Sequence, residues 1–388
     1  MTEFILTPAQ RKRSITIVVL TVSVVALTLG LTWPLLSLIL ESQGVSAKLI
    51  GLSSASQAIA VLAILPMAPW MMRRFGTVPL IACAIAAIIV ALLLLPAFPN
   101  VYAWFPIRFL LGAGVEILFI GCDVWVNQVA EEKTRGRVIG VYGFALAAGF
   151  AGGPLIINVT GIEGWAPFLA GAVIIAAAMI PLLWARGVVP TVEGHPAGRL
   201  MYFLGIAPTL MIAGLMFGFV DSAALSFLPI FGLAYGFDES TVVTMLTVVI
   251  VGTMLTQIPI GWLADHIGGR IMIIGSTILV AIPCSMLPFI MDMPFVLWPA
   301  LLVIGSALGG FYTIGMVMMG RRFKGADLVA VNAAFVAFWA LGSIAGPATT
   351  GIAIDATTVD AMPVVVVAAC LLYLPLAIIR LIKGAPEQ

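Results

Sequence analysis

The stretch Ile258-Pro259-Ile260-Gly261-Trp262-Leu263-Ala264-Asp265 has a counterpart earlier in the chain, Leu65-Pro66-Met67-Ala68-Pro69-Trp70-Met71-Met72. The two stretches lie 193 residues apart. The same offset relates Gly149-Phe-Ala-Gly-Gly153-Pro154 to Gly342-Ser-Ile-Ala-Gly346-Pro347, and Gly112 to Gly305. One offset that recurs at three places indicates an internal duplication. The sequence therefore predicts two related halves in parallel orientation.

The composition excludes most classes of soluble protein. Of the 388 residues, 62% are hydrophobic and only 9% are charged, whereas about a quarter of the residues are charged in a soluble domain. A globular core cannot hide this much apolar surface from water. The composition thus excludes a soluble enzyme, a nucleic-acid-binding protein and a disordered chain, and it predicts that lipid surrounds most of the molecule.

Twelve apolar segments are long enough to cross a bilayer, which takes about 20 residues in a helix. They are 15–40, 48–72, 77–97, 101–128, 136–158, 165–186, 202–233, 241–265, 270–290, 294–320, 328–353 and 360–381. The longest hydrophilic break, Gly187 to Leu200, falls at the midpoint. We expect an all-α polytopic membrane protein with two six-helix bundles, 1–186 and 202–388, and a cytoplasmic linker at 187–201.

The basic residues predict the orientation in the membrane. With the N-terminus in the cytoplasm, 16 of the 18 Lys and Arg residues fall in inside loops or tails. Of the other two, Lys48 is outside and Arg108 lies within a span. The outside loops hold seven acids, Glu41, Glu163, Asp238, Glu239, Asp292, Asp355 and Asp360. Because cytoplasmic loops are enriched in Lys and Arg, we expect both termini in the cytoplasm.

Four charged side chains lie well inside predicted spans, namely Arg108, Glu116, Asp123 and Asp221. A charge at the bilayer centre costs at least about 2.5–3.5 kcal/mol, so it should face a cavity or a partner. At 100° per residue, Gly112, Glu116, Asp123 and Asn127 lie about 40°, 80°, 60° and 100° around the helix from Arg108. They form one polar stripe. Proton coupling or substrate contact is one interpretation, and a structural salt bridge or interhelical hydrogen bond is the other.

Weaker candidates for a substrate cavity are Trp33, Phe227, Tyr312, Thr313, Gln57 and Gln257. For each of them, packing or hydrogen bonding between helices is the competing interpretation. The histidines are His195 and His266, and the four cysteines lie singly in apolar stretches without metal-ligand spacing. We therefore expect no metal, no cofactor and no enzymatic activity.

Local motifs resemble those of the major facilitator superfamily. Gly261-Trp-Leu-Ala-Asp265-His266-Ile-Gly268-Gly269-Arg270 resembles the Gly-x-x-x-Asp-(Arg/Lys)-x-Gly-Arg pattern between spans 8 and 9. The first-half counterpart departs from it, since Met72 or Arg73 stands where Asp is usual, followed by Arg74. The resemblance implies a gating motif made of Gly261, Asp265, Gly268, Arg270, Arg73 and Arg74. Asp265 would be a gate latch or only a helix cap.

Further motifs extend this resemblance over the whole chain. Arg108 with Gly112 and Gly114 resembles the superfamily's fourth-span motif. The spacing of four residues resembles the fifth-span motif of the superfamily's antiporters, namely Gly140, Gly149, Gly153 and Pro154. The same spacing recurs in the second half as Gly342, Gly346 and Pro347. Close packing of helices is the other interpretation of these residues. The second half resembles small bacterial YcaD-type permeases at Gln257 to Asp265 and at Ala330-Val-Asn332.

The resemblance implies a fold and a function. Spans 1, 4, 7 and 10 of the superfamily line a central cavity, which would place the stripe and Asp221 beside a substrate. We expect a monomeric secondary transporter of the bacterial cytoplasmic (inner) membrane that works by alternating access on a small-molecule substrate and protons. Export by substrate/proton antiport is the first interpretation. Proton-coupled uptake of an organic anion bound by Arg108 is the alternative, and a non-transporting membrane sensor is a lesser one.

Overall fold

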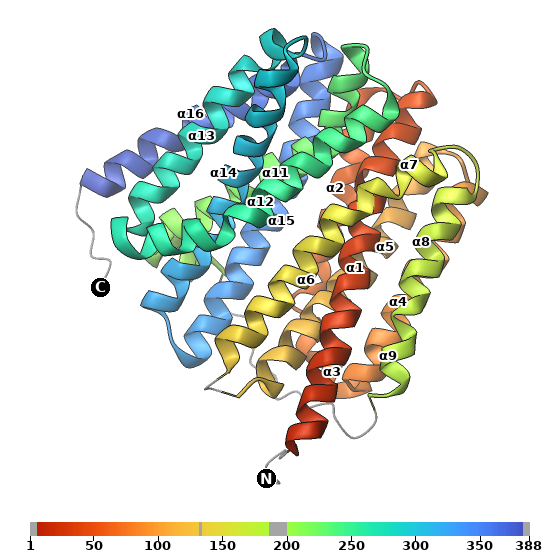
Figure 1. The fold of residues 1–388 in the computed structure, drawn as a ribbon, viewed down its shortest axis with the longest axis vertical. Helices are drawn as coiled ribbons and strands as arrows, with labels where there is room; N and C mark the ends of the chain where they lie inside the picture. The colour runs from red at the N-terminus through yellow and green to blue at the C-terminus, as the bar shows by residue number, and fades with distance from the viewer. Residues whose placement is uncertain (1–5, 132–133, 186–199, 383–388) are drawn as a thin grey trace. The chain divides into compact units, whose positions relative to one another are not determined.

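The computed structural model describes residues 6–131, 134–185 and 200–382, and within these ranges all regular secondary structure is helical. The helices are α1 (Pro8–Ser42), α2 (Ala47–Ile64), α3 (Ala68–Phe75), α4 (Thr77–Ala97), α5 (Val101–Val129), α6 (Arg135–Leu155), α7 (Ile157–Thr160), α8 (Ala166–Ala177), α9 (Met179–Leu183), α10 (Leu200–Ile206), α11 (Pro208–Ala234), α12 (Glu239–Ile267), α13 (Gly269–Ile290), α14 (Pro294–Arg322), α15 (Gly325–Ala356) and α16 (Ala361–Ile382) (Figure 1).

Twelve helical stretches of the described chain are long and apolar enough to cross a membrane. The prediction of an all-α protein with twelve spans is thereby confirmed. Two helices, α4 and α13, begin and end within one residue of the predicted segments 77–97 and 270–290. The predicted linker, 187–201, lies almost entirely outside the described residues.

Prolines break some of the predicted spans. The segment 48–72 forms two helices, α2 and α3, separated by a turn that contains Pro66. The segment 202–233 is likewise divided at Ala207, just before Pro208. Proline lacks an N–H group and disfavours helical geometry at the preceding residue. Pro259, the counterpart of Pro66 in the second half, lies inside the unbroken helix α12.

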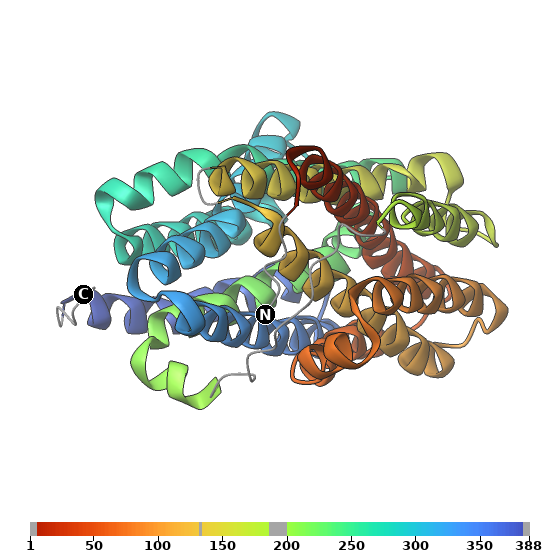
Figure 2. The ribbon, with the colours of Figure 1, turned by 90° about the horizontal axis from the view of Figure 1, so that it is seen from below.

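The described helices group into two compact units. The first unit comprises Met1–Leu35 and Ala63–Pro196, and the second comprises Leu36–Leu62 and Ala197–Gln388. The end of α1 and most of α2 therefore pack with helices from the second half of the chain. Within each unit the long helices run alongside one another (Figure 1, Figure 2).

In the first unit, glycines bring the backbones of α1 and α6 into direct contact. A Cβ atom at Gly149 would lie 2.3 Å from the carbonyl oxygen of Ser23. A Cβ atom at Gly153 would lie 2.4 Å from the backbone nitrogen of Leu31. Both distances are far inside van der Waals contact, so only glycine fits at these two positions of α6.

The second unit repeats this arrangement between α11 and α15. A Cβ atom at Gly342 would lie 1.9 Å from the carbonyl oxygen of Leu215, and one at Gly346 would lie 2.2 Å from that of Phe219. Gly218 of α11 approaches Trp339 of α15 equally closely. The fifth-span glycines and their counterparts 193 residues later thus make equivalent contacts with the first long helix of each unit.

A pair of matched substitutions tests this backbone contact. Gly342→Ala should lower the free energy of unfolding by about 1–3 kcal/mol, because α11 and α15 must separate to admit the methyl group. Gly275→Ala, in the second turn of α13, adds a methyl group where no neighbouring atom lies within 4 Å. It should be neutral or slightly stabilising, since alanine is the better helix former. Thermal unfolding of the two purified variants in detergent measures the difference, and equal melting temperatures would contradict the contact.

Candidate functional site

Helix α5 carries the polar stripe, and side-chain hydrogen bonds hold its first turn in place. The side chain of Asn100 accepts a hydrogen bond from the backbone N–H of Tyr102 at 2.8 Å and so caps the helix. The indole Nε1 of Trp104 donates to the carbonyl oxygens of Leu95 and Phe98 at 3.1 and 3.0 Å. These bonds join the start of α5 to the end of α4.

Two glycines define which face of α5 packs on α4. A Cβ atom at Gly114 would lie 2.8 Å from Ile88, and one at Gly121 would lie 3.1 Å from Ile81. Both glycines are about 160° around the helix from the acids Glu116 and Asp123. The polar stripe therefore lies on the face of α5 that points away from α4.

Exposure increases along the stripe toward the C-terminal end of α5. The Arg108 side chain is 1% exposed and that of Glu116 is 6% exposed, whereas Asp123 and Asn127 are exposed. Within the first unit, the stripe thus begins among buried neighbours and opens two turns beyond Glu116. The stripe thus combines charged groups that are shielded from solvent, at its start, with an exposed carboxyl group nearer its end.

Asp123 has a partner that the sequence analysis missed. The hydroxyl group of Tyr142, on α6, donates to Oδ1 of Asp123 at 2.6 Å. Tyr142 is itself buried. The signal available in the sequence was a single tyrosine within the apolar stretch 138–157. Asn127, by contrast, donates its amide to the carbonyl oxygen of Asp123 at 2.8 Å, so part of its hydrogen-bonding capacity is used within α5.

In the second unit, Asp221 lies half-buried on α11, one turn after Phe217. The ring of Phe217 lies 5.8 Å from that of Tyr312 on α14. Tyr312 in turn lies 6.4 Å from Phe335 on α15. A carboxyl group and a cluster of three rings therefore occupy neighbouring positions in this unit, and two of the residues, Asp221 and Tyr312, are among the sequence-based candidates.

The other residues predicted to line a substrate cavity differ in their burial and in the helices that they face. Phe227 is fully buried in the second unit, and Thr313 faces α12, where its methyl group would lie 3.6 Å from a Cβ atom at Gly261. Gln57 is buried, and its Oε1 has no hydrogen-bond partner among the described residues. Trp33, in the first unit, and Gln257, in the second, are half-buried.

The two halves make the same kind of turn at the predicted gating motif. Gly268 joins α12 to α13 with φ of 96°, and Gly76 joins α3 to α4 with φ of 81°. This region of backbone conformation favours glycine, which has no Cβ atom. Asp265 lies in the last turn of α12, and its side chain falls outside the described residues.

The arginines of the gating motif differ between the halves. In the second unit, Nη1 of Arg270 donates to the carbonyl oxygen of Arg380, on α16, at 3.4 Å. In the first unit, Arg73 and Arg74 are exposed in the last turn of α3.

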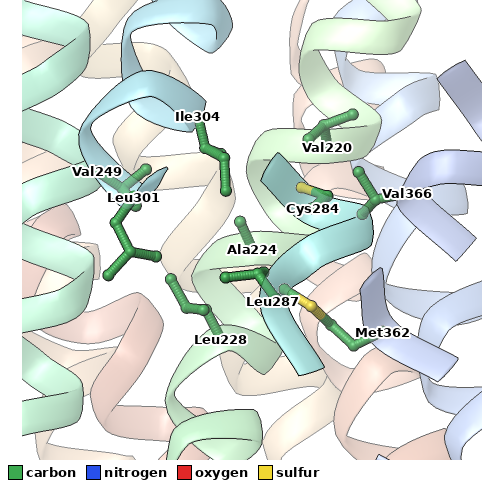
Figure 3. Close-up of a pocket in the computed structure, with 10 residues that line it drawn as sticks. All are labelled: Val220, Ala224, Leu228, Val249, Cys284, Leu287, Leu301, Ile304, Met362 and Val366. Carbon is green, nitrogen blue, oxygen red and sulfur yellow. The ribbon is translucent and has the colours of Figure 1, made fainter. Parts of the chain in front are cut away.

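One pocket lies inside the second unit, between α11, α12, α13, α14 and α16 (Figure 3). Its lining is wholly apolar and consists of Val220, Ala224, Leu228, Val249, Cys284, Leu287, Leu301, Ile304, Met362 and Val366. Asp221 follows Val220 directly but does not line the pocket. The pocket is lined by no carboxyl, amino, hydroxyl or amide side chain that could bind a polar solute.

The described residues were also compared with the usual ligand sets of metal ions in proteins. They contain no group of three or more His, Cys, Asp or Glu side chains arranged to hold a metal ion. The four cysteines are free thiols, of which Cys83 is exposed.

Comparison with protein families now identifies the architecture. The family model of the Major Facilitator Superfamily matches residues 18–245 and 210–388. The chain belongs to the Major Facilitator Superfamily. The resemblance proposed from the sequence motifs is thereby confirmed. The chain is thus an integral membrane protein of a transporter superfamily.

Two bacterial relatives are transporters of this superfamily. The MFS-type transporter YfkF of Bacillus subtilis is 26% identical over 341 residues, which cover 86% of this chain and 87% of the relative. The MFS-type transporter YcaD of Escherichia coli is 23% identical over 277 residues, covering 70% of this chain and 71% of the relative.

Solved structures share the fold. A bacterial homologue of the human lysosomal transporter Spinster superposes with a TM-score of 0.78 at 15% identity, covering 96% of each chain. The nucleoside transporter NupG superposes with a TM-score of 0.75 at 13% identity, covering 97% of this chain and 99% of that one. At such low identity these likenesses concern the fold alone.

Cysteine labelling tests whether the stripe reaches water. In a Cys83→Ala background, Asp123→Cys and Asn127→Cys should react with a hydrophilic maleimide in intact membranes, because a thiol in water forms the reactive thiolate. Val90→Cys is the matched control: Val90 is 47% exposed on α4 but belongs to an apolar face that we expect to meet lipid. Labelling of the control alone would refute the water-facing stripe.

Proposed function

We propose that this protein is a proton-coupled secondary transporter that exports a small organic solute in exchange for protons. In this proposal the bundles 1–186 and 202–388 alternate between two orientations and open a central site to each side of the membrane in turn. The observation that supports it best is the stripe on α5, where Arg108, Glu116 and Asp123 share the face opposite the packing contact with α4.

The stripe has the chemistry that proton coupling requires. A neutral carboxyl group is far less costly in apolar surroundings than a carboxylate. Glu116, in its buried position, would therefore exchange a proton when its access to water changes. Asp123 is exposed and accepts a hydrogen bond from Tyr142, which stabilises the charged form. Two acids on one helix face with different access to water could pass protons along the stripe.

The second unit supplies groups suited to an amphiphilic solute. Asp221 can bind a cationic or hydrogen-bonding group. The ring of Phe217, one turn before it on α11, and the ring of Tyr312 beside Phe217 offer apolar faces. A small compound with one charged or polar end and one aromatic or aliphatic end fits this set. We therefore propose an amphiphilic organic compound as the exported substrate class.

Uptake of an organic anion together with protons is the second candidate. The observation that favours it is the buried guanidinium of Arg108, which could bind a carboxylate in a forked geometry. In that reaction Arg108 would contact the substrate and the acids of α5 would carry the co-transported proton.

The proposal also covers orientation, oligomeric state and gating. We propose that the termini face the cytoplasm of a bacterial cell and that the protein acts as a monomer in the inner membrane. We also propose that Asp265 latches the turn between α12 and α13 in one orientation of the bundles, through the positive end of a neighbouring helix or a basic side chain.

A two-stage experiment tests coupling and direction together. Thermal stabilisation of the purified protein by a panel of amphiphilic cations and small carboxylates, at mildly acidic and at neutral pH, identifies a ligand and its linkage to protons. That ligand is then supplied to everted membrane vesicles that carry an acid-inside gradient. An antiporter accumulates the ligand in the vesicles at the expense of the gradient, whereas a symporter does not.

Substitutions in the same assay address the residues. Asp123→Asn and Asp221→Asn should each abolish gradient-driven accumulation while the protein remains folded in the membrane. Asp238→Asn, an exposed acid before α12, is the matched control and should transport normally. Asp265→Asn should slow turnover without weakening stabilisation by the ligand. Undiminished gradient-driven accumulation in both Asp123→Asn and Asp221→Asn would refute proton coupling at these sites.

A further inference from the structure

A second pocket lies at one end of the second unit and gathers three arginines from three helices. Its lining includes Arg270 at the start of α13, Arg322 at the end of α14 and Arg380 near the end of α16. Thr209, the second residue of α11, is the other polar residue of the wall. These arginines are separated by up to 110 residues in the sequence, so only the fold brings them together.

The start of α11 adds to the positive character of the pocket. Ala207, at the N-cap position, makes no side-chain cap for this 27-residue helix. The first N–H groups of a helix have no partner within it, and they carry the positive end of the helix dipole. In α11 these are the N–H groups of Thr209 and Leu210, because Pro208 has none. An anion in the pocket would therefore meet three guanidinium groups and an uncapped helix N-terminus at once.

The pocket wall is firmly packed. Ala207, Leu210 and Phe323 belong to a buried cluster that also includes Phe203, Met211, Met319, Val331, Ala334, Phe335 and Phe338. Arg270 is fixed to α16 by its hydrogen bond to the carbonyl oxygen of Arg380. The guanidinium of Arg322 lies 5.5 Å from the ring centre of Phe323. The arginines are thus arranged on a preformed surface rather than on a loose loop.

The helices that carry Arg270 and Arg380 also expose apolar side chains. Next to Arg270 on α13, Ile271 is 47% exposed, and beyond Arg380 on α16, Ile382 is 77% exposed. These helices pack against each other. The acyl chains of a lipid could cover these exposed apolar side chains of α13 and α16, from which a soluble anion would gain nothing.

The opposite end of the unit has the reverse character. There, Oδ2 of Asp355 accepts a hydrogen bond from the backbone N–H of Lys48 at 3.2 Å, and Oδ1 of Asp360 accepts one from the hydroxyl of Tyr235 at 2.7 Å. Burial, together with this bond to Asp360, raises the pKa of Tyr235 to about 12. At the arginine end, five basic residues stand against the two acids Asp265 and Asp327, namely Arg270, Arg321, Arg322, Lys324 and Arg380. The net charge there is positive, so an anionic headgroup is favoured at that end.

We propose that this arginine pocket binds the phosphate of an anionic phospholipid from the leaflet at that end of the helices. The guanidinium groups and the start of α11 would hold the headgroup, and the acyl chains would lie along α13 and α16. Basic pockets between membrane helices recognise anionic headgroups in this way. The site is separate from the α5 stripe, and its occupancy does not depend on the proposed transport activity.

Lipid binding to the delipidated full-length protein in detergent tests the proposal. Phosphatidylglycerol should raise the melting temperature and bind more tightly than phosphatidylcholine with the same acyl chains. The double variant Arg322→Gln/Arg380→Gln should bind phosphatidylglycerol about tenfold more weakly, because charge-assisted hydrogen bonds to the phosphate are lost. Lys324→Gln removes a nearby exposed charge that does not line the pocket and should bind as the unaltered protein does.

Two further measurements separate the alternatives. Inorganic phosphate should compete only weakly with phosphatidylglycerol; equal affinity for inorganic phosphate would overturn the lipid assignment in favour of a soluble anion. Should the double variant fold poorly, Arg322→Gln alone, at an exposed position, replaces it and should still weaken binding. Unchanged affinity for phosphatidylglycerol in a correctly folded variant would overturn the proposal.

Discussion

Helices that meet in a bilayer gain little from burying apolar side chains, because the acyl chains around them are equally apolar. Close contact between backbones takes the place of that driving force. Gly149 and Gly153 allow the backbone of α1 to lie directly against α6. Gly342 and Gly346 do the same for α11 and α15. Gly114 does the same for α5 against α4. Each contact also determines which face of a helix is occupied by packing and which face is left for polar side chains.

The position of the charges follows from this use of the helix faces. A charge inside the bilayer is tolerated where it meets a cavity or a partner. On α5 the packing face is taken by glycines, and the acids and Arg108 occupy the opposite face. On α11 the glycine contact with α15 leaves Asp221 half-buried near the Phe217 ring. The proposed proton coupling would use these carboxyl groups, which lie on helix faces that do not take part in the glycine contacts.

Much of the fold could be predicted because it depends on local pattern. The spans follow from runs of apolar residues, the duplication from a constant offset, and the α5 stripe from helical periodicity. Partners across helices could not be predicted, since the sequence does not say which helices touch. Tyr142 as the partner of Asp123 and the burial of Phe227 are of this kind. So is the effect of proline: Pro66 ends a helix, whereas its counterpart Pro259 does not.

The central claim is that carboxyl groups within the spans exchange protons as conditions change. Difference infrared spectroscopy of the reconstituted protein, stepped between mildly acidic and neutral pH, measures this directly through the carboxyl stretching band. The account predicts a band change in the unaltered protein that is lost when Glu116→Gln, Asp123→Asn and Asp221→Asn are combined. A band change of the same size in the triple variant would contradict it, because the titrating groups would then lie elsewhere.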